Sequence, residues 1–309
     1  MFFSFAISII LILCITSYQE ITRKLYFVTF THQIRERTIC YPLNYENEKK
    51  FAILLNLLTK LVFKYLLILS IIISESFIIL TTFLAYIEPG SNFKIITMIF
   101  WVISILVFFI QCFGVLWFGF VQWFGISFYL VLKFKEVFEK IQLITRNTKN
   151  VLNGNRILKA IEEHNYVRKL TEEMNHFFRL ITLIIYLIAT PGFLICLYVS
   201  QHRDTTRITS FFTFGIFITC FAPVILMNLM SSKIDQAAKR PMALLYRYFS
   251  RPNNFLYLKK RLKIFAFMEH LIGADIGFSC YNLFHMDMLA FYQYIYVCGI
   301  HYLLLYDLF

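Results

Sequence analysis

The basic residues of this chain are concentrated in three long connections between hydrophobic segments. Of its 30 Lys and Arg residues, 27 lie within residues 19–64, 133–179 or 231–287. The two other connections, near residues 88–94 and 200–209, carry the remaining three. Lys and Arg close to membrane-spanning segments are retained in the cytoplasm. The alternation therefore predicts a polytopic membrane protein whose three basic connections are cytoplasmic.

The composition is also typical of a membrane protein rather than of a soluble domain. Hydrophobic residues make up 59% of the 309 residues and charged residues only 16%, whereas soluble domains average about 25% charged residues. We attribute the net charge of +12 to contact with the anionic inner leaflet of a lipid bilayer rather than with nucleic acid. The seven cysteines form no C-x-x-C pair, so we expect free thiols, no metal site and no cofactor.

We predict an all-α fold, a polytopic transmembrane helical bundle with cytoplasmic helical extensions, in a single membrane domain covering 1–309. At about 20 apolar residues per crossing, six crossings are predicted, at residues 2–18, 65–87, 95–132, 180–199, 210–230 and 288–309. The charge rule places the C-terminus outside the cell and the protein in the plasma membrane. Residues 2–18 lack the basic start and cleavage site of a secretory signal, so we expect a membrane helix or a signal anchor.

The third predicted crossing is longer than a bilayer requires. It has 38 residues, 95–132, without Lys, Arg, Asp or Glu. Only Gly114, Gly119 and Gly125 interrupt it, and two crossings here would break the charge alternation downstream. We therefore expect one long helix that continues into the cytoplasm.

Two cytoplasmic stretches show helical periodicity. After a turn at residues 153–155, the recurring residues are Ile157, Ile161, His164, Val167, Leu170, Met174 and Phe177. Charged residues occupy the other faces, at Glu162, Glu163, Arg168, Lys169, Glu172 and Glu173. In the second stretch the recurring residues are Phe255, Leu258, Leu262, Phe265 and Ile272. Both patterns predict amphipathic helices that need a partner. Within 180–199, Pro191-Gly192 predicts a kink or a close approach by a neighbouring helix.

No catalytic signature is present in the sequence. It contains no H-E-x-x-H, G-x-S-x-G or Walker sequence, so we do not expect an enzyme. His270, His285 and His301 have no further metal ligand at helical spacing. We interpret each of them as a structural histidine.

The candidate ligand-binding residues lie in the predicted crossings. Glu75, between Ser74 and Ser76, is the carboxylate placed deep in a crossing, where an ionisable group is a functional candidate. A structural hydrogen bond to another helix explains it equally well. Aromatic residues in the outer halves of the crossings suit a site for small apolar ligands. They are Tyr86, Phe100, Trp101, Tyr198, Phe211 and Phe212.

The last predicted crossing is rich in tyrosine and other polar residues. Val297, His301, Leu304 and Leu308 fall on one stripe of a helix. Such a stripe could line a pore with a hydrophobic constriction. The alternative, an interior bundle helix with hydrogen-bonded tyrosines, fits the pattern as well.

Three segments resemble the arthropod gustatory and odorant receptors. Residues 163–178, with His164 and Asn175, resemble the His…Asn-x-x-Phe stretch before that family's fifth helix. The last nine residues resemble the end of gustatory receptors, where Thr-Tyr is followed by five hydrophobic residues and Gln-Phe. Tyr302 and Phe309 match in spacing, while His301 replaces the Thr and Leu308 replaces the Gln. Residues 277–287 also resemble the family's approach to its last helix.

The resemblance implies a seven-helix receptor of inverted topology that acts as a ligand-gated, nonselective cation channel. It implies a homo- or hetero-tetramer with related receptor subunits and a pore lined by each subunit's last helix. A small-molecule tastant or odorant would bind in the outer half of the bundle. The long third crossing and the two amphipathic stretches would form a cytoplasmic anchor domain. By this count the family's first helix has no counterpart, and residues 2–18 correspond to its second.

Two other classes of membrane protein are alternatives to this one. A G-protein-coupled chemoreceptor needs its last helix to end in the cytoplasm, which the loop charges disfavour unless a crossing is missed within 95–132. A transporter or lipid scramblase is the third class. The sequence lacks the repeat symmetry that is common in transporters.

Overall fold

The computed structural model describes residues 41–61, 64, 92–146, 153–184, 186, 190–201, 207–250, 258–273, 275–280 and 283–308, with the side chains of the longest helix described from Gly119 onward. The helices are residues 45–61, α4 (Asn92–Arg146), α5 (Asn153–Ile184), α6 (Thr190–Gln201), α7 (Arg207–Phe249), α8 (Leu258–Gly273) and α9 (Met288–Leu308). Two short antiparallel strands, β1 (Ser279–Cys280) and β2 (Phe284–His285), place Ser279 opposite His285. The described residues are almost entirely helical, which confirms the predicted all-α class.

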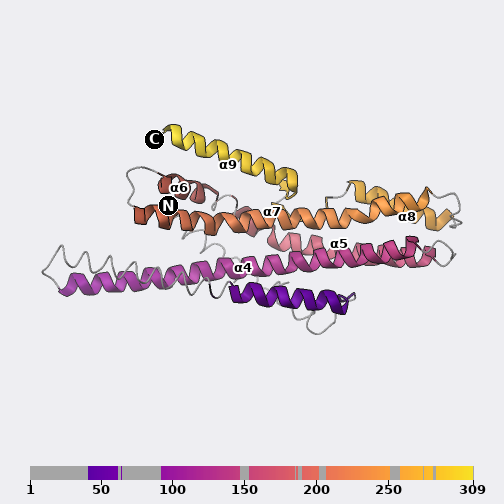
Figure 1. The fold of residues 1–309 in the computed structure, drawn as a ribbon, viewed down its shortest axis with the longest axis horizontal. Coiled ribbons are helices and arrows are strands. Elements are labelled where there is room, and N and C mark those ends of the chain that lie inside the picture. The colour runs from indigo at the N-terminus through magenta and orange to yellow at the C-terminus, as the bar shows by residue number, and fades with distance from the viewer. Residues whose placement is uncertain are drawn as a thin grey trace.

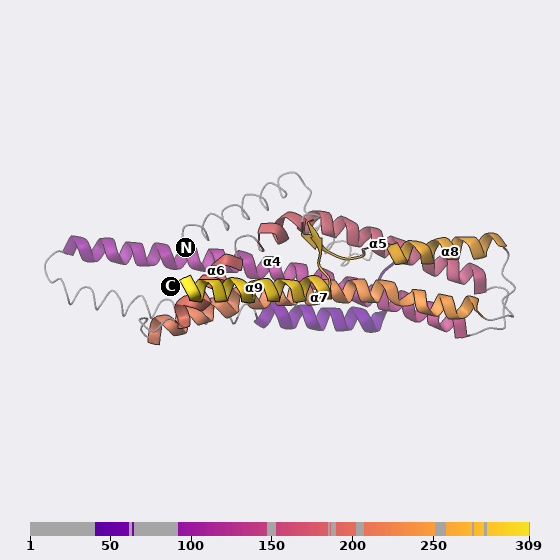
Figure 2. The same ribbon diagram turned by 90° about the horizontal axis from the view of Figure 1, so that it is seen from above.

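The bundle is elongated and is built along two long helices, α4 and α7 (Figure 1). They run side by side. Helices α5 and α8 lie along one half of this pair, and α6 and α9 lie along the other half, where the chain ends (Figures 1 and 2). Helix 45–61 lies against α4, and the Leu55 side chain would be 3.3 Å from a Cβ added at Gly125. The two halves of the bundle therefore have different helices around a shared axis.

Helix α4 is unbroken over the whole of residues 95–132, so no turn divides this stretch. Its buried apolar residues recur every three or four positions, which keeps them on one side of a helix. They include Trp123, Ile126, Leu130, Phe134, Val137 and Ile141. Burying each such side chain stabilises the fold by about 1.5–3 kcal/mol. The ring of Trp123 also lies 5.1 Å from that of Phe278, near the strands.

The amphipathic stripe predicted for α5 is confirmed with two differences. Ile157, Val167 and Met174 are buried in the core, as the spacing predicts. The helix, however, begins at Asn153, where the sequence predicts a turn. Glu163, assigned to a charged outer face, is also buried. It belongs to a network of charges described below.

Helix α8 is amphipathic, but the predicted stripe faces outward. The buried residues are Ile264, Phe267, Met268 and Leu271. The residues predicted to need a partner, hereafter the outer stripe of α8, are exposed: Leu258, Leu262, Phe265 and Ile272. Phe255 lies outside the described residues. Both faces of α8 are apolar, so its periodicity predicts a helix but not which side contacts the bundle.

The predicted crossings correspond only partly to described helices. Residues 2–18 and the whole of 65–87 lie outside the described residues. Residues 180–199 are divided between the end of α5 and the start of α6. Pro191 occupies the first turn of α6, where its missing N–H costs no helical hydrogen bond. Among the described residues, no helix is both long enough and apolar enough to cross a membrane.

Candidate functional site

Helix α9 is attached to the bundle along one narrow face. Tyr294, Cys298 and Tyr302, one turn apart, form this docking face, which packs with Leu194 of α6 and Phe217 and Phe221 of α7. The Tyr294 hydroxyl lies 3.0 Å from the Thr190 hydroxyl at the start of α6. The Tyr302 hydroxyl donates a hydrogen bond to Gln201 at the end of α6. Two polar contacts therefore hold α9 parallel to α6, one near each end of that helix.

The predicted pore face of α9 is exposed. Val297 is 46% exposed and Leu304 is 53% exposed, and His301 is also on the surface. The His301 Nδ1 atom lies 2.8 Å from the Val297 carbonyl oxygen, one turn earlier. The side chain of Leu308 lies outside the described part of the chain. At about 100° per residue, this face lies roughly a quarter turn from the docking face. Val297, His301 and Leu304 are exposed and are not covered by any helix that the structure describes.

The chain enters α9 through the β1–β2 hairpin, which is held by hydrogen bonds to α5 and α7. The Ser279 N–H donates to Asn175 Oδ1 at 2.8 Å, and Asn175 Nδ2 donates to Ser279 Oγ at 3.0 Å. The Phe278 N–H donates to Ser231 Oγ at 3.1 Å. Asp287 then caps α9, because its Oδ1 accepts from the Ala290 N–H at 2.7 Å. Asn175, which the family resemblance singles out, therefore positions the hairpin.

Gly277 allows the backbone to approach closely beside this hairpin. Its φ of +156° is a conformation that favours glycine. A Cβ at this position would lie 3.1 Å from the His285 ring and 3.3 Å from Ser231 Oγ. The start of α9 is thus set by one glycine and by hydrogen bonds to two other helices.

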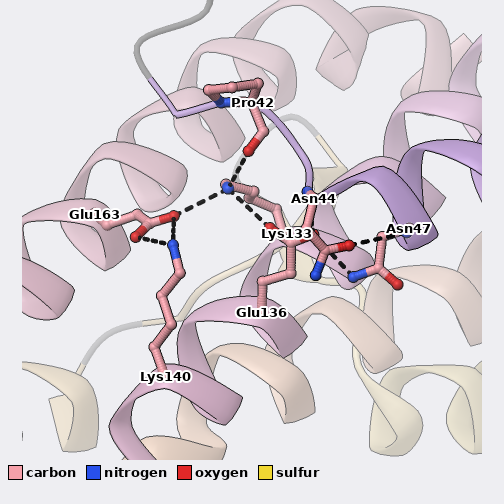
Figure 3. Close-up of polar contacts among 7 residues, drawn as sticks. All are labelled: Pro42, Asn44, Asn47, Lys133, Glu136, Lys140 and Glu163. Carbon is pink, nitrogen blue, oxygen red and sulfur yellow. Dashed lines mark hydrogen bonds and ion pairs between the residues drawn. The ribbon is translucent and has the colours of Figure 1, made fainter.

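A charge network joins α4, α5 and the segment before helix 45–61 (Figure 3). It consists of Lys133, Glu136, Lys140 and Glu163. Lys133, Glu136 and Glu163 are buried in it, whereas Lys140 is half-exposed. Lys133 Nζ lies 3.0 Å from Glu136 Oε2 and 2.9 Å from Glu163 Oε1, and it donates to the Pro42 carbonyl oxygen at 2.9 Å. Lys140 Nζ lies 2.7 Å from Glu163 Oε2. All three donors that an ammonium group offers are therefore used at Lys133.

The carboxylate of Glu136 extends the charge network to the N-terminal segment. Its Oε1 accepts from the Asn44 N–H at 2.8 Å and from Asn47 Nδ2 at 2.9 Å. Asn44 in turn caps helix 45–61, because its Oδ1 accepts from the Asn47 N–H at 2.9 Å. The network thus fixes where helix 45–61 begins.

Two Lys and two Glu make the charge network neutral, which lowers the cost of burying it. Burial alone raises the pKa of Glu163, but hydrogen bonds from Lys140 and Lys133 outweigh burial and hold the pKa below its ordinary value. The Glu163 carboxylate therefore stays ionised. Lys133, Glu136 and Glu163 use their polar atoms within the network, and these contacts join three segments of the chain.

His164 is the second residue to which the family resemblance points, and it is fully buried. Its Nε2 atom lies 2.9 Å from the Ala238 carbonyl oxygen of α7, so this nitrogen carries the proton and donates. The rings of Phe134 and Phe267 lie 5.1 Å and 5.0 Å away. Burial lowers the pKa of His164 to about 4. His164 is therefore a neutral residue that connects α5 to α7.

The predicted ligand-binding residues are mostly beyond what the structure describes. Glu75, Tyr86 and Phe309 lie outside the described residues, as do the side chains of Phe100, Trp101, Phe211 and Phe212. Tyr198 is partly buried in α6. Of the three histidines interpreted as structural, His270 contacts Arg168 of α5, and His285 lies against Gly277.

Sequence reasoning missed the charge network. Lys133 is the first charged residue after the uncharged stretch of α4 and precedes Glu136 by one turn, which is the signal that could have indicated it. Within the described residues, no group of three or more His, Cys, Asp or Glu side chains could hold a metal ion. No known family profile and no curated protein matches the chain.

Proposed function

We propose that this protein is a chemosensory receptor of the plasma membrane that acts as a ligand-gated, nonselective cation channel. In this proposal four subunits surround a pore lined by α9, and a small-molecule tastant or odorant opens it. The observation that carries the proposal is the attachment of α9. This helix is bound by one narrow face, while the predicted pore face and the apolar residues beyond it stay exposed.

The exposed side of α9 is difficult to explain for an isolated chain in water. Leu289, Tyr292, Tyr296 and Leu303 are each more than 60% exposed. Large continuous apolar patches indicate contact with a membrane or with other subunits. A helix shared between a lipid-embedded bundle and a central pore accounts for both its apolar residues and its polar His301.

The charge pattern supports the same arrangement from independent data. With the three basic connections in the cytoplasm, the uncharged part of α4 lies in the membrane and its charged end lies inside the cell. The charge network and His164 then belong to a cytoplasmic anchor in which α4, α5, α7 and α8 are joined. The outer stripe of α8 is the proposed contact between anchors of neighbouring subunits.

Whole-cell recording from cells that express the full chain tests the proposal. Bitter, sweet and volatile compounds are applied to the wild type and to Leu308→Gln and Val297→Ala. Leu303→Ala, on the opposite exposed side of α9, is the matched control. We expect a cation current whose selectivity or block changes in the two pore-face variants and not in the control.

A glycosylation reporter fused after Phe309 tests the topology separately. We expect modification, because the proposal places the C-terminus outside the cell. An unmodified reporter, together with ligand-evoked second messengers and no current, would instead support a G-protein-coupled receptor.

A further inference from the structure

Tyr294 lies where four segments of the bundle meet. Its hydroxyl pairs with Thr190 of α6 at 3.0 Å. Its ring packs edge-on against Tyr186, between α5 and α6, with centroids 5.0 Å apart and an interplanar angle of 78°. The Tyr186 hydroxyl accepts a hydrogen bond from Asn228 of α7. We call these four residues, with Cys298, the Tyr294 junction.

The Tyr294 junction is more protected than the other polar contact of α9. Tyr294 and Thr190 are partly buried, whereas the contact between Tyr302 and Gln201 is exposed. An exposed hydrogen bond competes with water and is easily broken, whereas a buried partner left unpaired carries a desolvation cost. The α9 helix is therefore held firmly near its start and weakly near its end.

The Tyr294 junction contains one unused hydrogen-bond acceptor among the described residues, the Oδ1 atom of Asn228. This residue is fully buried, and its Nδ2 donates both to Tyr186 and to the Val224 carbonyl oxygen. Its Oδ1 has no hydrogen-bond partner among the described residues. A buried acceptor of this kind is costly to leave unpaired. It gives the Tyr186 hydroxyl a second possible arrangement, in which Tyr186 donates to Asn228 Oδ1.

The predicted pore face begins three residues after Tyr294. Val297 and His301 share a rigid helix with Tyr294, so a rotation or tilt of α9 about the junction moves both of them. We propose that Tyr294 is a positioning residue that sets the orientation of α9 against α5, α6 and α7, while the Tyr302–Gln201 contact releases when α9 moves. The effect of this positioning on conduction rests on the channel function proposed above.

The reactivity of Cys298 tests this positioning without requiring conduction. Cys298 is 7% exposed on the docking face, so a thiol reagent reaches it only when α9 separates from α6 and α7. The full chain, purified in detergent, is treated with a maleimide, and modification at Cys298 is followed by peptide mass spectrometry. Cys280 is an internal reference, because it is buried beside α5 and outside α9.

Tyr294→Phe keeps the ring and removes the hydroxyl. We expect the modification rate of Cys298 to rise by about three- to tenfold, the equilibrium change that loss of one buried hydrogen bond causes. The rate at Cys280 should stay unchanged. Tyr296→Phe, on the exposed side of the same helix, is the matched control and should leave both rates unchanged. Tyr302→Phe should raise the Cys298 rate about twofold or less.

Three results would overturn the inference. An unchanged Cys298 rate in Tyr294→Phe would show that the hydroxyl does not hold α9. An equal rise at Cys280 would show a general loosening, and an equal rise in Tyr296→Phe would show that position 294 is not special. None of these results requires that the protein conduct ions.

Recording from cells separates this inference from the proposed function. If the wild type conducts, Tyr294→Phe should change the basal current per surface-expressed protein, and Tyr296→Phe should not. A raised Cys298 rate with an unchanged basal current would overturn the link to gating. If the Cys298 rate rises in Tyr294→Phe but the wild type conducts under no tested compound, the positioning role is supported and the result counts against the channel.

Discussion

Lys133 of α4 and Glu163 of α5 form an ion pair of 2.9 Å although both side chains are nearly fully buried. Removing one partner of a buried pair leaves the other charge uncompensated, which costs more than the pair contributes. At this position the cost is compounded, because Lys133 also serves Glu136 and the Pro42 carbonyl. The contact between α4 and α5 is therefore sensitive to mutation of this pair.

Lys133→Met should destabilise the folded chain by about 3–5 kcal/mol, because two carboxylates lose their shared cation. Thermal unfolding of the purified protein, followed by circular dichroism, measures the change. The matched control is Lys135→Met, two residues away, whose 3.8 Å pair with Glu139 is half-exposed. That control should change stability by less than about 1 kcal/mol. Equal effects in the two variants would contradict a special role for the charge network.

The stability of the fold should fall in mild acid because of His164. Its pKa is about 4 in the folded chain and near 6.5 when unfolded. Between these values the unfolded state binds more protons, so stability decreases as the pH falls through this window. We expect a loss of about 2 kcal/mol between about pH 7 and pH 5, measured by denaturant unfolding at each pH.

His164→Asn isolates this effect. Its stability at neutral pH should be lower, but its decline between about pH 7 and pH 5 should be much smaller than in the wild type. His176→Asn, on the exposed side of the same helix, should keep the wild-type decline. Glu163 affects stability in a different pH range. Because its pKa is lowered from 4.5 in the folded chain, its contribution to stability is present above about pH 4.5 and is lost only as the pH falls further.

Gly277→Ala should disturb the entry to α9. An added methyl group would lie 3.1 Å from the His285 ring, at a backbone angle that alanine rarely adopts. We expect a loss of about 1–3 kcal/mol in thermal unfolding. Gly273→Ala, at the end of α8 with nothing within 4 Å of the added carbon, is the control and should be nearly neutral. A neutral Gly277→Ala would mean that the hairpin adjusts without cost.

The sequence predicts the helices better than it predicts their contacts. The α5 stripe is correct because charged residues fill its other faces, so only one side can enter the core. In α8 two apolar stripes compete, and periodicity cannot distinguish them. The sequence identifies Lys133 only as a lysine of a predicted cytoplasmic connection, because its partners Pro42 and Glu163 become its neighbours only after folding. The β1–β2 hairpin is too short to produce a strand pattern.

The outer stripe of α8 provides a test of assembly. Leu262 is 59% exposed in the single chain, so Leu262→Glu should leave the stability of the isolated subunit within about 0.5 kcal/mol of the wild type. If neighbouring subunits cover the stripe, the buried carboxylate should shift the protein from tetramers to smaller species. Size-exclusion chromatography with light scattering, in detergent, measures this shift. Leu143→Glu is the control, because Leu143 of α4 is equally exposed, at 63%, but lies outside the stripe. A tetramer that resists Leu262→Glu and dissociates with Leu143→Glu would move the proposed contact from α8 to α4.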